Sequence, residues 1–243
     1  MIKQLIIDNQ NLIRTKALQR RSYHFFDDLL KIKKIVSFIG PRRSGKTFLM
    51  LQFVQELVAR GLLQREQVVF LDFSLSGYEK LQSNELLSIY KSLYPDLQPF
   101  FIFDEIQEKT DFKNFVLTLY NQGFQIFLSG SNAHLLSAEL STHFRGRVFE
   151  YQVLPLTFAE AARFKGFSLE KHQSSEQLGK LKHLLDEVLQ YGTFPEIVLA
   201  QDALFKKDLL KSYLDILIYK DLLERYKIEN ELALKYLMKT LAL

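Results

Sequence analysis

The sequence predicts an α/β protein with a mostly parallel sheet that carries helices on both faces. Over roughly the first 150 residues, short apolar runs typical of buried strands alternate with longer segments of helical apolar spacing. A glycine-rich loop joins the first run to the first helical segment. After Pro155 the strand signals stop and helical spacing continues alone. We therefore expect two domains, an α/β domain over residues 1–154 and a helical region over residues 155–243.

The first two strands of this pattern each lead to a helix. Residues 35–39, IVSFI, are apolar throughout, and residues 48–60 beyond the loop carry helical spacing that Gly61 ends. A second run covers residues 67–73, and the helical segment 81–94 after it stops before a proline. Strand followed by helix is the repeating unit of a parallel sheet.

Three further runs complete the predicted sheet. PFFIFDE over residues 99–105 precedes a helical pattern over 112–123, which ends in a glycine. QIFLSG over 125–130 and VFEYQVL over 148–154 are the fourth and fifth runs. In such sheets ligands bind at the carboxyl ends of the strands.

The region after residue 155 has helical patterns over residues 181–190, 204–226 and 231–243. Residues 165–177 are polar and contain glycine, so we expect an exposed connection there. No repeat or low-complexity tract is apparent.

Composition narrows the class of protein. A chain of 243 residues with 47% hydrophobic content can build a sizeable core. No cysteine is present, which excludes disulfides, thiolate zinc sites and catalytic thiols. No window approaches the apolar length of a membrane span, and the N-terminus lacks the apolar core of a signal peptide. We expect a cytoplasmic protein.

Basic residues are concentrated near the N-terminus. Residues 1–34 hold eight lysines and arginines against three acids, among them Arg14, Lys16, Arg20 and Arg21. Such a segment is a possible DNA contact, because lysine and arginine displace counterions from phosphates. Alternatively, the basic segment is simply a solvent-exposed surface next to a pocket that binds a polyanion such as a nucleotide.

The octapeptide GPRRSGKT fits the phosphate-binding loop at every fixed position and has the required strand before it and helix after it. Its backbone amides, lysine and threonine supply what a triphosphate and Mg²⁺ need. The predicted nucleotide ligands are Gly40, Pro41, Arg42, Arg43, Ser44, Gly45, Lys46 and Thr47, with Thr47 also on the metal.

Two adjacent carboxylates, Asp104 and Glu105, follow the third apolar run and resemble a Walker B motif. Asp104 would hold Mg²⁺ through water, and Glu105 would polarise the attacking water. If the motif occurred without a phosphate loop upstream, the alternative would be a strand that simply ends in acidic residues exposed to solvent.

Polar residues after the fourth and before the fifth run extend the predicted site. Ser131 and Asn132, with Ser129 before them, resemble a sensor 1 position, although the same residues could simply cap a helix. Arg145 and Arg147 are candidates to stabilise transition-state charge, or they form ion pairs. The sequence leaves open whether either arginine would act in its own chain or on a neighbour.

The order of the motifs is similar to that of one prokaryotic ATPase family. The phosphate loop, DEIQ, SGSNAHLLS, RGRVFEYQVLPLTFAEAARF and GTFPEIV occur in the order seen in AAA_14/DUF4143 proteins. The resemblance implies an AAA-like P-loop NTPase with sheet order 5-1-4-3-2, a preference for ATP, and further winged-helix and nuclease-like regions that this chain would lack. Tyr191 stands where many relatives have a second glycine, which puts the local turn in doubt.

The resulting functional hypothesis is an Mg²⁺-dependent ATPase that couples nucleotide state to a protein partner or effector domain. A nucleotide-operated DNA- or protein-binding switch with little turnover is the alternative. A small-molecule kinase is a third reading, which the adjacent carboxylates favour less. GTP is disfavoured because the NKxD guanine signature is absent.

Overall fold

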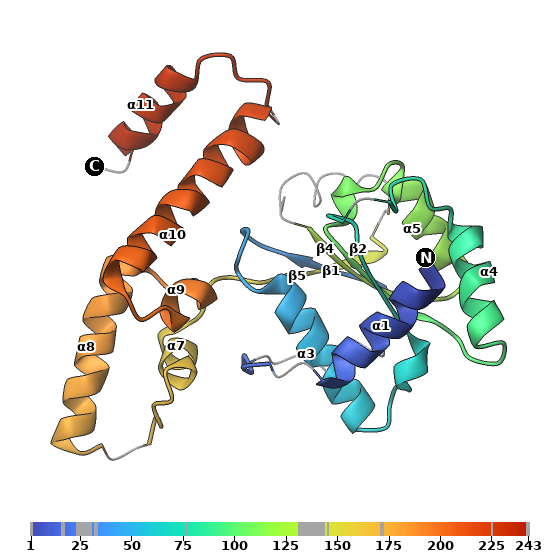
Figure 1. Cartoon of the computed structure of the whole chain (residues 1–243), viewed down its shortest axis with the longest axis horizontal. Helices are drawn as coiled ribbons and strands as arrows, with labels where there is room; N and C mark the ends of the chain where they lie inside the picture. The colour runs from blue at the N-terminus through green and yellow to red at the C-terminus, as the bar shows by residue number, and fades with distance from the viewer. Residues whose placement is uncertain are drawn as a thin grey trace. The chain divides into compact units, whose positions relative to one another are not determined.

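The computed structural model describes residues 2–15, 18–22, 31, 34–75, 77–130, 144, 146–170, 173–224 and 226–241. The chain divides into two compact units, Met1–Pro155 and Leu156–Leu243 (Figure 1). The first unit contains the sheet, and the second is helical. Within the described ranges no helix combines the length and apolar character needed to cross a membrane.

Five strands form one sheet in the order β2-β3-β4-β1-β5, and all four strand pairs are parallel. Read from the other edge, this is the order 5-1-4-3-2 that the family resemblance implied, so the predicted fold class is confirmed. The strands are β1 (Ile35–Ile39), β2 (Val68–Asp72), β3 (Phe100–Asp104), β4 (Gln125–Gly130) and β5 (Val148–Gln152).

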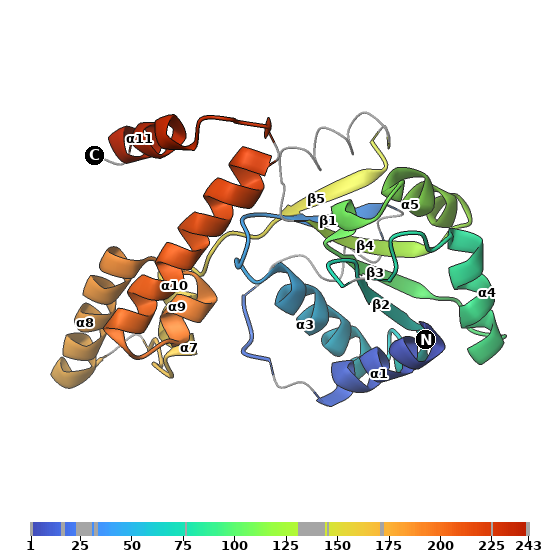
Figure 2. The ribbon, with the colours of Figure 1, turned by 45° about the horizontal axis from the view of Figure 1, so that its top comes forward.

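Helices cover both faces of the sheet (Figure 2). On one side lies α3 (Lys46–Ala59), whose buried residues pack on Val36, Phe38 and Phe127 among others. On the other side lie α4 (Ser83–Leu93) and α5 (Phe112–Asn121). The result is a three-layer α/β unit, with short 3₁₀ turns at Arg65–Gln67 and Ile106–Glu108.

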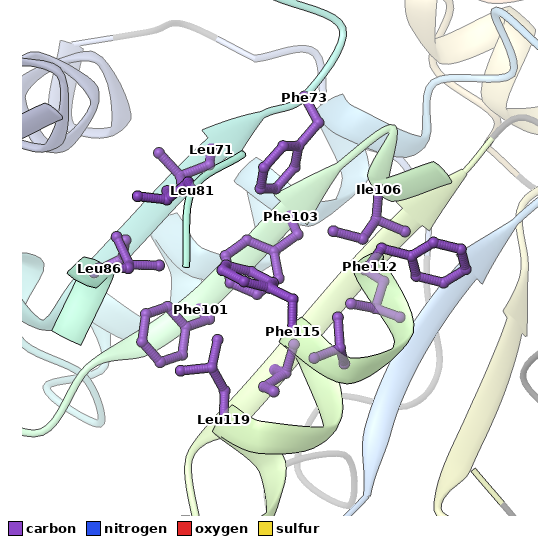
Figure 3. Packing of buried hydrophobic residues seen from close by; sticks show 14 of the residues in the cluster. Leu71, Phe73, Leu81, Leu86, Phe101, Phe103, Ile106, Phe112, Phe115 and Leu119 are labelled. Carbon is purple, nitrogen blue, oxygen red and sulfur yellow. The ribbon is translucent and has the colours of Figure 1, made fainter. Parts of the chain in front are cut away.

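Phenylalanines dominate the core on the α4–α5 side. Figure 3 shows Phe101 and Phe103 of β3 beside Phe115 and Leu119 of α5, and the rings of Phe103 and Phe115 are 5.3 Å apart. Because alternate strand residues face opposite sides, the neighbouring Ile102 belongs to the core on the α3 side. β3, buried along its whole length, is therefore a rigid support for the carboxylates at its end.

An N-terminal helix, α1 (Ile2–Thr15), which was not anticipated from the sequence, packs along the edge strand β2. Asn9 donates a side-chain hydrogen bond to the carbonyl of Phe70 at 2.8 Å, and Gln10 donates one to the carbonyl of Val68 at 3.0 Å. Side-chain amides thus satisfy backbone acceptors that an uncovered edge strand would expose.

The second unit contains helices of unequal length. In chain order they are α7 (Phe158–Phe164), α8 (Ser175–Tyr191), α9 (Pro195–Leu199), α10 (Ala203–Ile216), a π-helical continuation over Leu217–Glu224, and α11 (Glu231–Leu241). Helix α8 begins earlier than the predicted 181–190, inside the stretch expected to be an exposed connection. The cause is a capping box in which Ser174 and Gln177 satisfy each other's backbone amides.

The two family motifs of this unit have structural roles. In LPLTFAE, Thr157 and Glu160 form the capping box that starts α7. The amide of Leu156 donates to the carbonyl of Thr193 in GTFPE at 2.9 Å, which ties the two motifs together. Tyr191 ends α8, and the turn uses only Gly192, at φ 79°.

Candidate phosphate and metal site

The carboxyl ends of β1, β3 and β4 lie at the same edge of the parallel sheet, because Ile39 pairs with Gly130 and Phe103 with Leu128. The phosphate loop follows β1 directly. This register brings the loop, the end of β3 with its carboxylates and the end of β4 to one place.

The loop wraps the start of α3. Arg43 and Gly45 have left-handed backbone conformations, with φ 63° and 92°, and no side chain caps the helix at Gly45. The first amides of a helix lack intrahelical partners and carry a partial positive charge, so they bind anions. Lys46 is 5% exposed, and its ammonium donates to the carbonyls of Gly40 at 3.1 Å and Pro41 at 2.9 Å.

One further polar group in the loop is suited to a polar ligand. Ser44 is completely buried, and within the described ranges its hydroxyl has no hydrogen-bond partner. A buried hydroxyl without a partner is costly, and an incoming phosphate oxygen would relieve that cost.

The carboxylate of Asp104 connects the loop to two strands. Thr47 Oγ1 donates to Asp104 Oδ2 at 2.5 Å, and the Ser129 hydroxyl at the end of β4 donates to the other carboxylate oxygen. The Glu105 amide lies 3.4 Å from Ser129 Oγ. Ser129 is completely buried, so its role here is to orient Asp104.

Burial raises the pKa of Asp104 above its ordinary value. The hydrogen bonds from Ser129 and Thr47 act in the opposite direction, because they stabilise the carboxylate. The nearby acids Glu105 and Asp72 add to the rise. A carboxylate crowded by acids and shielded from water is well suited to bind a cation.

Glu105 has a strained backbone, with φ 48° and ψ 46°. Non-glycine residues rarely adopt this left-handed conformation, and such strain is concentrated at functional sites. The Glu105 carboxylate accepts a hydrogen bond from Gln107 Nε2 at 2.5 Å. The two adjacent carboxylates therefore have different hydrogen-bond partners, Thr47 and Ser129 for Asp104 and Gln107 for Glu105.

Not every predicted residue can be placed at this site. Ser131, Asn132 and Arg145 lie outside the described residues. Arg147 precedes β5, at the amino ends of the strands, and its guanidinium lies 5.9 Å from the ring of Tyr120. Five strand residues span about 16 Å, so Arg147 is far from the phosphate loop of its own chain.

Two residues that hold the carboxylates of the site were not assigned this role from the sequence. Ser129 was considered as part of a sensor 1 position or a helix cap, and its hydroxyl instead donates to Asp104. Gln107, which holds Glu105, was not considered, although its position in DEIQ two residues beyond the glutamate was a usable signal.

The family follows from a comparison with known families. The model of AAA_14, described as an AAA domain, matches residues 32–162, which include the loop, both carboxylates and all five strands of the sheet. The chain belongs to the AAA_14 family. Its AAA domain continues past β5 into α7, so LPLTFAE lies within the family match.

Relatives of this AAA_14 chain are longer. An uncharacterised protein of Methanocaldococcus jannaschii is 34% identical over 99% of this chain and 53% of its own length. An uncharacterised protein of Haemophilus influenzae is 29% identical over 94% of this chain and 56% of its own length. The chain thus spans about half the length of these curated relatives.

Two solved structures resemble the AAA_14 chain in part. PCH-2 from C. elegans gives a TM-score of 0.46 at 14% identity, covering 81% of this chain and 59% of that one. AMPPCP-bound DnaA from Aquifex aeolicus gives a TM-score of 0.42 at 18% identity, covering 83% of this chain and 61% of that one.

Proposed function

We propose that this chain binds ATP with Mg²⁺ at the phosphate loop and hydrolyses the terminal phosphate. The observation that carries the proposal is the hydrogen bond of 2.5 Å between Thr47 and Asp104, which joins the predicted phosphate loop to the predicted metal-binding carboxylate. In a glycine-rich loop without function, there would be no reason for the threonine to form a hydrogen bond with a carboxylate 57 residues later in the chain.

The side chains present fit a magnesium ion. A hydroxyl and a carboxylate are hard oxygen donors, and Mg²⁺ in nucleotide sites uses one or two such protein ligands together with phosphates and water. Thr47 and Asp104 would hold it, with Ser129 keeping the carboxylate in place. When bound, the ion would neutralise charge on the phosphate oxygens.

The remaining roles follow from where each group lies. Lys46 would exchange its bonds to Gly40 and Pro41 for phosphate oxygens, at little cost because both sets are oxygen acceptors. Glu105 would polarise the attacking water, and Gln107 would hold its carboxylate through the hydrogen bond that it donates. Arg145 remains a predicted source of transition-state stabilisation, and Ser131 and Asn132 remain predicted contacts to the terminal phosphate.

ATP binding and hydrolysis would change the conformation of the first unit, and this change would be passed to a partner or to the helical unit. A nucleotide can shift such a conformational equilibrium only by as much as its affinity differs between the two states. Residues 153–157, the connector, lead directly from β5 of the first unit into α7. DNA contact by the N-terminal segment remains a prediction.

The test compares native protein with Glu105→Gln, using Glu108→Gln as a matched control on an exposed side chain of the same turn. Calorimetry would give ATP affinity in Mg²⁺, and phosphate release without any acceptor would give turnover. We expect Glu105→Gln to keep its affinity and lose turnover by about 10²–10⁴-fold, with Glu108→Gln unchanged.

Other outcomes select other functions. Tight binding without turnover in the native protein would favour the nucleotide-operated switch. Phosphate transfer that requires an added acceptor would favour a kinase. Measurable turnover that survives Glu105→Gln unchanged would remove Glu105 from its proposed role.

A further inference from the structure

Residues 18–22 pass alongside the phosphate-loop helix, where one backbone position is held from both sides. The amide of Arg21 donates to Gln52 Oε1 at 2.9 Å, and Gln52 Nε2 donates back to the Arg21 carbonyl at 3.1 Å. Gln52 belongs to α3 and is 2% exposed. A paired amide of this kind fixes both the position and the direction of the Arg21 backbone.

The Arg21 side chain reaches the phosphate loop itself. Its Nη1 donates to the carbonyl of Ser44 at 2.9 Å, and its Nη2 lies 3.4 Å from the carbonyl of Pro155. Ser44 is in the loop, and Pro155 is the last residue of the first unit. One planar guanidinium therefore contacts both the loop and the connector to the second unit.

The Ser44 carbonyl belongs to the same peptide group as the Gly45 amide. A trans peptide is planar, so its C=O and N–H point in opposite directions. Holding the carbonyl toward Arg21 therefore aims the Gly45 N–H the other way, among the loop amides that face a phosphate. Gly45 has φ 92°, and glycine offers little resistance to rotation of this peptide.

Val153, the first residue of the connector, lies against the end of β1 and the first residue of the loop. The Val153 amide donates to the Ile39 carbonyl at 2.7 Å. A Cβ placed on Gly40 would lie 2.1 Å from the Val153 carbonyl oxygen. The backbone of Gly40, the first residue of the loop, is therefore in close contact with Val153.

We propose that Arg21 is a positioning residue, whose guanidinium sets the Ser44–Gly45 peptide for phosphate binding and links the loop to the connector at Pro155. This rests on the proposed function of the same site and adds a residue outside the recognised motifs. Lysine should replace Arg21 only in part, because two different nitrogens of the guanidinium reach the two carbonyls, whereas lysine carries one nitrogen in a different geometry.

The test uses Arg21→Ala and Arg21→Lys, with Arg20→Ala as the matched control. The Arg20 side chain is 63% exposed and reaches Glu56 only at 3.9 Å, so its removal takes away the same charge without touching the loop. Two measurements are made on each folded variant: hydrogen exchange of peptides covering residues 40–50 and 150–157 without nucleotide, and ATP affinity in Mg²⁺ by calorimetry.

We expect Arg21→Ala to exchange faster in both peptides and to bind ATP roughly tenfold more weakly, a loss equal to one or two hydrogen bonds. Arg21→Lys should be intermediate, and Arg20→Ala should match the native protein. If Arg21→Ala does not fold, the comparison of Arg21→Lys with Arg20→Ala decides. Native-like exchange and native-like affinity in the Arg21 variants would overturn the proposal.

The exchange measurement separates this proposal from the proposed function. Native protein that binds no ATP would refute nucleotide binding, while faster exchange in Arg21→Ala would still support the role of Arg21 in holding the loop. Slow exchange in Arg21→Ala together with normal ATP binding in the native protein would refute only the role of Arg21.

Discussion

Gly40→Ala tests whether contact with the connector sets the shape of the phosphate loop. The added methyl group would lie 2.1 Å from the Val153 carbonyl oxygen and 3.0 Å from its carbon. A carbon and an oxygen in ordinary close contact are about 3.3 Å apart. The loop or the connector must therefore move by about 1.2 Å, and neither neighbour is the flexible end of a side chain.

The cost can be estimated from this displacement. Relieving an overpacked contact of one methyl group typically costs about 1–3 kcal/mol. In the variant the loop would relax away from Val153, and ATP would have to restore the binding conformation at that cost. A penalty of about 1–3 kcal/mol corresponds to roughly 5- to 150-fold weaker binding.

The assay is ATP titration in Mg²⁺ alongside thermal unfolding, with Gly123→Ala as the control. Gly123 also has a positive φ, +88°, but an added Cβ there meets nothing within 4 Å. Both variants carry backbone strain, whereas only Gly40→Ala has the steric clash. ATP affinity in Gly40→Ala equal to that in Gly123→Ala would refute the reasoning.

Three further changes have expected outcomes. Thr47→Ala should weaken Mg²⁺-dependent ATP binding by about tenfold or more, whereas Thr47→Ser should retain it; calorimetry with and without Mg²⁺ would check this, and equal losses would count against a metal role. Gly179→Ala should raise the melting temperature, because Gly179 lies within α8 with open space around it and alanine favours helix by about 1 kcal/mol; a lower melting temperature would contradict this. Glu187→Gln should destabilise the fold by about 3 kcal/mol, since the buried Lys206 ammonium and Lys165 share this carboxylate; urea unfolding would measure it, and an unchanged midpoint would show that the pair contributes little.

The sheet was predictable because its signals are local. Strands β1 to β4 are short, largely apolar runs in the sequence, and the alternation of such runs with helical patterns predicts that the strands are parallel. The phosphate loop was predictable for the same reason, since glycine, lysine and threonine occur at fixed spacing. The strand order itself came from family resemblance, because alternation does not specify which strands are neighbours.

The remaining features depend on contacts between distant segments. Helix α1 lies on the edge of β2 through Asn9 and Gln10, polar residues that did not suggest burial against a sheet. Ser129 was grouped with Ser131 and Asn132 as a sensor 1 position or a helix cap, but strand pairing places its hydroxyl on Asp104. The start of α8 was missed because a capping box in a polar stretch outweighed the lack of apolar residues.

Arg20 and Arg21 show why charge counting alone could not interpret the N-terminal segment. They are adjacent and identical in type, yet one is exposed near Glu56 and the other donates to a loop carbonyl. Every residue carries a backbone carbonyl, so a sequence gives no sign of which carbonyls will attract a guanidinium. Any salt-dependent DNA affinity of this segment should therefore fall with Arg20→Ala, whereas Arg21→Ala should act first on the phosphate loop.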